Sequence, residues 1–178
     1  QNLWKWEDTT PIVREDVLIR AFRATEAGRY VDVQVCLTGL VDGVAIGGRP
    51  KAGYGGFAIR AQPGQDQKIA LHTDPEDSNP RRAWIDYSAV FPGGNQPVGI
   101  TLLEHPGNPD YPSELQEYAN LNCVMSAFPG AREVPLPKGE TLVLKYRIWI
   151  HSGTADEKTL GQVWCAYAKP PQITVKQD

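Results

Sequence analysis

Alternating apolar and polar residues recur along the chain and predict a protein made mainly of β-strands. In residues 30–40 apolar side chains alternate with Asp, Gln, Cys and Thr. In residues 140–151 one face is Leu, Tyr and Ile, and the other mixes cations, an indole and an imidazole. Period-two alternation is typical of a strand with one buried face. Shorter stretches of this kind predict strands at 17–25, 57–61, 83–91 and from Val98 onward. We therefore expect an all-β, mainly antiparallel fold, arranged as a β-sandwich or part of a supersandwich.

One segment near the C-terminus has helical spacing instead. It predicts an amphipathic helix over about residues 155–168, packed on the sheet. The segment from Thr154 to Glu157 fits a capping box, in which the threonine hydroxyl caps the third helical amide. Prolines at 170–171 are expected to stop the helix. Residues 113–127 fit no single pattern, and we expect a helical turn followed by an extended piece. The apolar positions of the helix are Leu160, Val163, Trp164 and Tyr167.

The strand that begins at Val98 is expected to end in a stiff loop. After Glu104 and His105 the sequence becomes Pro-Gly-Asn-Pro-Asp-Tyr-Pro, with three prolines in seven residues. Each proline removes a backbone donor, fixes φ and disfavours helical conformation in the residue before it. Rigid loops at strand ends commonly carry binding and catalytic groups. This loop therefore offers an acid, an imidazole, the amide of Asn108 and a phenol, unless it is only a proline-rich turn.

A predicted hairpin brings further side chains toward this loop. Residues 83–91 and the strand from Val98 are joined by a glycine- and proline-containing turn. The residues farthest from that turn on each arm lie at the same end of a hairpin. Trp84 and Asp86 should therefore lie near Glu104 and His105, although the register that decides which face each occupies cannot be read from sequence.

Composition narrows the classes of protein further. The 178 residues carry a formal net charge of −3 and are 41% hydrophobic, which fits one domain, residues 1–178, with a real core. No basic stripe suggests nucleic acid, and no apolar run approaches the length of about 18 residues that spans a bilayer. The three cysteines (Cys36, Cys123 and Cys165) are widely spaced, so their pairing stays open.

Motifs for bound cofactors and metals are weak. The stretch Gly-Tyr-Gly-Gly-Phe-Ala at 53–58 matches a loose dinucleotide pattern, but the segment after it reads as a strand rather than a helix. We reject that interpretation and expect the glycines to bend the backbone. His72, His105 and His151 lie far apart in sequence, whereas a copper or zinc site favours clustered ligands. We therefore predict neither a cofactor nor a metal.

Four collinear segments resemble a bacterial family of unknown function whose members are often labelled methane oxygenase or PmoA family. They are residues 51–60, 84–88, 98–112 and 138–157. The resemblance implies an exported protein, periplasmic or secreted, similar to the mutarotase-like supersandwich and often found with sugar-processing enzymes. It also implies a longer chain with a histidine-rich N-terminal part that is not present here. A sheet without that part would have an open edge, which favours pairing with a second copy or another protein chain.

The first functional hypothesis is a carbohydrate-active domain that binds a sugar or glycoside on a concave sheet face. Aromatic stacking and planar polar groups are the usual means of recognising sugars. If chemistry occurs, His105 with Glu104 or Asp86 is the expected acid–base set, suited to hydrolysis, elimination or epimerisation. The expected ligand-binding residues are Tyr54, Arg60, Trp84, Asn108, Arg147 and Trp149. The alternative is a non-catalytic β-sandwich module that binds a glycan or a protein partner, so the sequence leaves open whether the protein is an enzyme.

Overall fold

The structure is a computed structural model that describes residues 1–49 and 53–169. Its elements confirm a mostly antiparallel β protein with one C-terminal helix. The strands are β1 (Asn2–Trp6), β2 (Thr10–Ala21), β3 (Arg29–Gly39), β4 (Ala45–Gly47), β5 (Phe57–Arg60), β6 (Gln65–Thr73), β7 (Ala83–Val90), β8 (Val98–Glu104), β9 (Glu114–Tyr118), β10 (Cys123–Ala127), β11 (Glu133–Pro135) and β12 (Thr141–Ser152). A 3₁₀ turn, η1 (Ala119–Leu121), joins β9 to β10, and α1 (Glu157–Ala168) follows β12.

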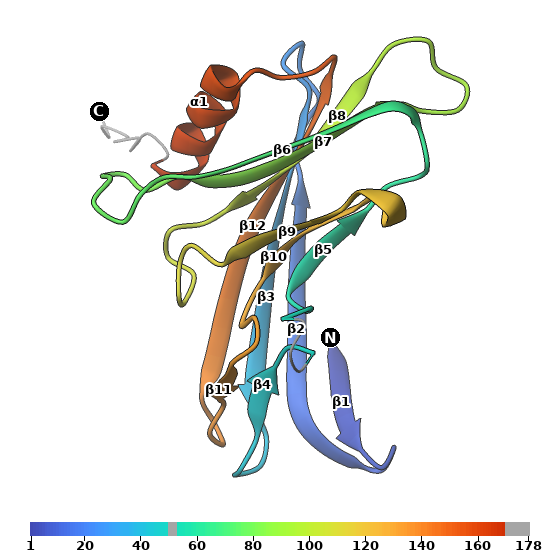
Figure 1. The fold of residues 1–178 in the computed structure, drawn as a ribbon. Helices are drawn as coiled ribbons and strands as arrows, with labels where there is room; N and C mark the ends of the chain where they lie inside the picture. Colours follow the sequence, from blue (N-terminus) through green and yellow to red (C-terminus); the bar gives the residue numbers. More distant parts are fainter. Residues whose placement is uncertain (50–52, 170–178) are drawn as a thin grey trace, which may run out of the picture.

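A seven-stranded antiparallel sheet forms the centre of the molecule, in the order β1-β2-β3-β12-β8-β7-β6. The direction of the strands rotates strongly from one side of the sheet to the other, as expected from the right-handed twist of strands. In Figure 1, β2, β3 and β12 run nearly vertically, whereas β6, β7 and β8 lie across them near the top. The strand β12 lies at the centre of this order and is paired on both sides, with β3 and with β8.

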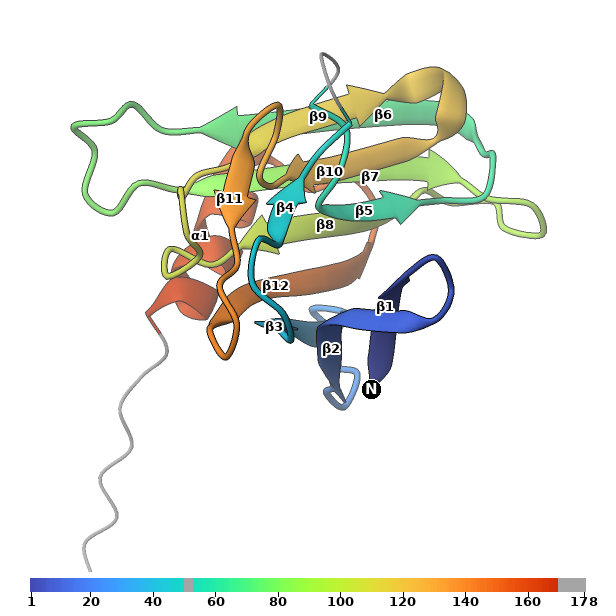
Figure 2. The same cartoon turned by 90° about the horizontal axis from the view of Figure 1, so that it is seen from below.

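The two faces of this sheet are covered by different elements over the β12-β8-β7 half. A three-stranded sheet, β5-β10-β9, packs on one face, and α1 packs on the other. Figure 2 shows the small sheet lying beside β6, β7 and β8 while β1, β2 and β3 extend away from it. The architecture is therefore sandwich-like, and the β2-β3 half of the large sheet is left without a second full layer. Ile85, Tyr87, Leu102, Val124 and Tyr146 form the centre of the core between the sheets.

The helix forms where its periodicity predicted it, but its cap differs. Asp156 is the N-cap, with its side chain accepting a hydrogen bond from the Thr159 amide at 2.7 Å. The expected capping box from Thr154 is therefore wrong. Glu157 is committed elsewhere, since its carboxylate lies 3.0 Å from Nδ1 of His72 on β6 and ties the start of the helix to the sheet. The prolines at 170–171 lie outside the described residues.

Two other regions were harder to read from the sequence. The ambiguous stretch 113–127 consists of β9, η1 and β10, so the extended conformation is commoner there than we expected. The segment Gln65–Thr73, where no strand was predicted and whose last two residues were read as the start of a polar loop, forms the edge strand β6. No helix among the described residues has the length and apolar character needed to span a membrane.

Candidate functional site

A polar hollow of about 400 Å³ opens on the helix side of the large sheet, over β2, β3 and β12. It lies beside the C-terminal end of α1, where the helix no longer covers the sheet. The alternation of β12 directs Lys145 and Arg147 to this face, because Leu144 and Tyr146 belong to the core on the other. The side chains that give the hollow its polar character are Arg20, Gln34, Asp32, His105, Lys145 and Arg147.

Arg147 is held in one place by four neighbours. Its guanidinium makes a two-point ion pair with Asp32 on β3, at 2.5 Å from Nε to Oδ1 and 2.8 Å from Nη2 to Oδ2. The same group lies 4.6 Å from the ring centre of Tyr167 and 5.3 Å from those of Phe22 and Tyr30. Bidentate pairing and cation–π contact both restrict a guanidinium. Arg147 is therefore a rigid wall of the hollow whose charge is already compensated.

His105 lies at the corner where β8 ends. Its Nδ1 accepts a hydrogen bond from the Gly107 amide at 3.0 Å, and its ring meets Tyr167 edge-on at 5.2 Å. Burial, followed by the nearby charges of Lys145 and Arg147, lowers the pKa of His105 below its ordinary value of 6.5. The imidazole is thus neutral at neutral pH, with its hydrogen on Nε2. It can donate a hydrogen bond to a ligand, but its other nitrogen is occupied.

Asn108 anchors the proline loop to the neighbouring strand β12. Its side-chain amide donates to the carbonyl of Lys145 at 3.0 Å and accepts from the Lys145 amide at 2.7 Å. This pair imitates the backbone ladder of a neighbouring strand and fastens the loop to the edge of β12 where β8 has ended. Asn108 is only 5% exposed, so it is not accessible for the ligand contact that we expected of it.

Glu104 points to the opposite face from the hollow and is buried between the sheets. It accepts hydrogen bonds from the hydroxyl of Ser113 at 2.6 Å and from its amide at 2.9 Å, which anchors the far end of the proline loop. Burial raises the pKa of this carboxyl above its ordinary value, although the Ser113 bonds act the other way. Strand alternation explains its position, because Glu104 shares a face with Leu102.

Replacing Glu104 with glutamine is expected to flatten the pH dependence of stability. The folded-state pKa lies above the ordinary 4.5, so the folded protein keeps a proton that the unfolded chain releases. The contribution of Glu104 to the free energy of unfolding is therefore complete below the ordinary pKa. It is lost as the pH rises through the folded-state pKa, with a slope of up to about 1.4 kcal/mol per pH unit. Urea unfolding between about pH 4 and pH 8 measures the slope. Glu114→Gln, at an exposed carboxyl on β9, should keep the wild-type slope; an unchanged slope in Glu104→Gln contradicts the assignment.

Asp86 lies on the helix side of the large sheet, on the same face as Trp84, in a closed polar cluster. One carboxylate oxygen accepts from the Thr101 hydroxyl at 2.6 Å and lies 3.1 Å from Nε2 of His151, whose ring stacks on Trp149 at 4.1 Å. Both Asp86 and His151 are less than a tenth exposed. Glu104, His105 and Asp86 therefore occupy three separate environments, and the structure does not assemble them as the expected acid–base set.

The aromatic residues expected to stack on a sugar are in the core. Trp84 is 2% exposed and Trp149 is 5% exposed, so neither presents a face to a ligand. Trp149 also donates its indole hydrogen to the carbonyl of Ala27 at 2.7 Å. Polar residues lie two positions away from each of these tryptophans in the sequence, and we therefore expected a sheet face open to ligand. In the structure α1 packs over both tryptophans.

Tyr54 and Arg60 lie away from the hollow. Arg60 ends β5 on its exposed side, because Phe57 and Ile59 turn toward the core. Tyr54 precedes that strand and meets Tyr118 edge-on at 5.8 Å. Of the nine expected site residues, only His105 and Arg147 line the polar hollow.

Several residues of the hollow were missed in the sequence. Lys145 shares the mixed face of β12 with Arg147, and that alternation was a usable signal. Tyr167 was placed on the helix but given no role, and Arg20 and Phe22 lie in or next to the end of β2, on the far side of β3. The strand order brings these residues of β2, β12 and α1 together, and the strand order cannot be read from the sequence. Within the described residues no three His, Cys, Asp or Glu side chains are grouped to hold a metal ion.

The comparisons with known proteins identify a family without a known activity. No curated protein and no solved structure shows significant similarity to the chain. Residues 1–165 match DUF6807, described as a family of unknown function. The match agrees with the expectation of a family of unknown function. It supports neither the methane oxygenase label nor a resemblance to the mutarotase-like supersandwich. The chain belongs to this family of unknown function, DUF6807.

Proposed function

We propose that the protein binds a carbohydrate in the polar hollow, and that the preferred ligand is a sugar or glycoside bearing a carboxylate. The observation that carries the proposal is a pair of cations, Arg20 and Lys145, that face the hollow without an ion-pair partner among the described residues. The Arg147–Asp32 pair is neutral as a unit, so the balance of charge in the hollow is positive. An anionic group fits such a surface.

The remaining walls suit the rest of a sugar. The His105 Nε2 hydrogen and the Gln34 amide offer hydrogen bonds to hydroxyls, and Phe22 adds an apolar wall. A volume of about 400 Å³ is in the range of small-molecule sites. Concave sites with few polar groups among apolar walls are the usual form of such sites.

The geometry supports binding better than acid–base catalysis. A histidine base normally has a carboxylate or carbonyl that orients it. Here Nδ1 of His105 accepts a hydrogen bond from the Gly107 amide, and Glu104 and Asp86 have other partners. The non-catalytic alternative from the sequence is therefore the version we propose.

Removing the charge of Lys145 tests the proposal. In Lys145→Gln, the affinity for uronate oligosaccharides measured by calorimetry is expected to fall roughly tenfold, because a charged hydrogen bond is lost. Affinity for the matching neutral oligosaccharides should change little. Lys68→Gln, at an exposed lysine on the edge strand β6, is the control and should bind as the wild type does. Equal wild-type affinity for acidic and neutral sugars, or an equal loss in the control, contradicts the proposal.

A further inference from the structure

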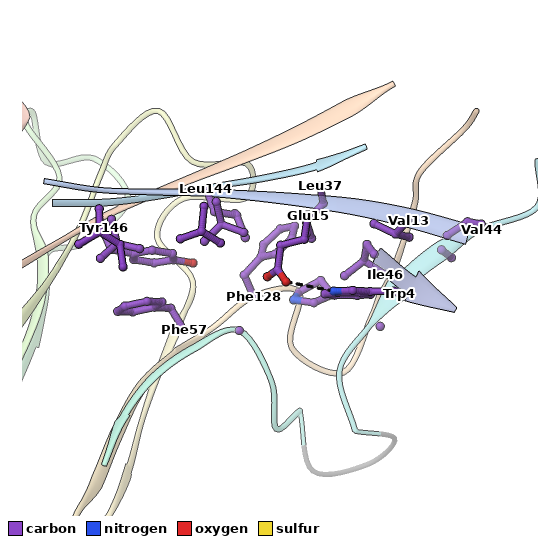
Figure 3. Close-up of a pocket in the computed structure, with 18 of the residues that line it drawn as sticks. Trp4, Val13, Glu15, Leu37, Val44, Ile46, Phe57, Phe128, Leu144 and Tyr146 are labelled. Carbon is purple, nitrogen blue, oxygen red and sulfur yellow. Dashed lines mark hydrogen bonds between the residues drawn. The ribbon is translucent and has the colours of Figure 1, made fainter. Parts of the chain in front are cut away.

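A second cleft lies on the opposite face of the same strands. It has a volume of about 690 Å³ and opens between the β1-β2-β3-β12 half of the large sheet and the segments around β4, β5 and the end of β10. It exists because the small sheet covers only the other half of this face. Its walls are almost wholly apolar, with Val13, Leu37, Val44, Ile46, Phe57 and Leu144 among them (Figure 3).

The rim of the cleft exposes apolar side chains to solvent. Val17 is 44% exposed and Ile19 is 64% exposed, on the part of β2 that the small sheet does not reach. Trp4 on β1 closes the other side and is 37% exposed. A contiguous exposed apolar surface of this kind is typical of a binding site for a ligand, a protein or a membrane. Because the cleft has walls on two sides, its shape suits a small molecule rather than a flat protein surface.

One charged residue stands in this apolar setting. Glu15 on β2 is the single charged side chain among the described residues that line the cleft. Figure 3 shows it pointing from the sheet toward Trp4, among the apolar side chains. Its Oε2 accepts hydrogen bonds from Trp4 Nε1 at 3.3 Å and from Asn2 Nδ2 at 3.4 Å. No hydrogen bond to its Oε1 and no ion pair of Glu15 is found among the described residues.

We propose that this cleft binds an amphipathic small molecule with an apolar body and a protonated amine at one end. The apolar body fills the space between the valines of the large sheet and the stacked pair of Phe57 and Tyr146. The ammonium group pairs with the Glu15 carboxylate, on the oxygen that Trp4 and Asn2 leave free. The inference rests on charge complementarity within an apolar cleft and is independent of the sugar proposal, which concerns the other face.

A matched series of amphiphiles tests the charge. Decylamine, decanol and decanoate share one chain, and each is titrated below the concentration at which it forms micelles, with calorimetry as the readout. The wild type is expected to bind decylamine roughly tenfold more tightly than decanol and decanoate least, since a charged hydrogen bond favours only the amine. In Glu15→Gln the amine should lose that advantage while decanol binds as before. Decanoate binding as tightly as decylamine, or no binding of the amine, overturns the proposal.

A second pair of variants tests the location. Val17→Trp places a large side chain at the rim of the cleft on an already exposed position, so the fold should be kept. It is expected to weaken decylamine binding at least fivefold, because the indole occupies the entrance and excludes part of the alkyl chain, whose burial drives binding. Leu71→Trp makes a comparable change at an exposed apolar residue of β6 and should bind as the wild type does. Unchanged binding in Val17→Trp shows that the amine binds elsewhere and refutes the assignment.

Discussion

Replacing Trp164 with alanine is expected to lower the free energy of unfolding by about 4 kcal/mol and the melting temperature by roughly 10 °C. The indole is fully buried between α1 and the sheet, where it packs in one cluster with Trp84 and Leu103. Its Nε1 also donates to the carbonyl of Glu104 at 2.9 Å, at the point where β8 gives way to the proline loop. The substitution therefore leaves a cavity and removes the partner of a buried carbonyl.

Chemical denaturation followed by far-UV circular dichroism measures this loss. Gln162→Ala, an exposed position on the same helix, should change stability by less than about 0.5 kcal/mol. Trp164→Phe keeps most of the apolar volume and should fall between the two. A Trp164→Ala protein as stable as Gln162→Ala contradicts the packing of α1 on this face.

Replacing Asp86 with alanine is expected to cost about 3 kcal/mol of stability. The carboxylate is the shared partner of the Thr101 hydroxyl and the His151 ring, and both of these residues are buried. Without it, two buried polar groups lose their hydrogen-bond partner, and each such loss costs about 1–3 kcal/mol. Unfolding in urea gives the difference.

Ser88→Ala is the matched control for this prediction. Ser88 lies two residues along β7, on the same face, and is equally buried. Its substitution should cost far less, since no described side chain is hydrogen-bonded to it. Removing Asp86 at no greater cost than removing the Ser88 hydroxyl would show that the cluster does not stabilise the fold.

Much of the secondary structure was readable from local pattern. The alternation in residues 30–40 and 140–151 predicted β3 and β12 within one residue at each end, because a sheet buried on one side imposes a period of two. The helical spacing of Leu160, Trp164 and Tyr167 predicted α1 in the same way. The hairpin of β7 and β8 was also predicted, and Trp84 does pair with Leu103, next to Glu104.

The candidate site was only partly predictable. His105 and Arg147 were singled out and line the hollow, whereas Trp84 and Trp149 pack against α1 and Asp86 is buried in its own polar cluster. A mixed polar and aromatic strand face looks the same in sequence whether it is open to solvent or covered by a helix. What separates the two cases is where along the strand the helix lies, and this depends on contacts far apart in the chain.

By itself the sequence determined which side chains share a strand face, because that follows from backbone geometry at each residue and needs no partner. It placed Lys145 and Arg147 together on the mixed face of residues 140–151. Only the tertiary structure decided which faces are covered. The order β1-β2-β3-β12-β8-β7-β6 sets the small sheet and α1 over one half of the large sheet and leaves a hollow on each side of the other half. The physical reason is that strand order and layer packing arise from long-range contacts, whose partners no local pattern of residues specifies.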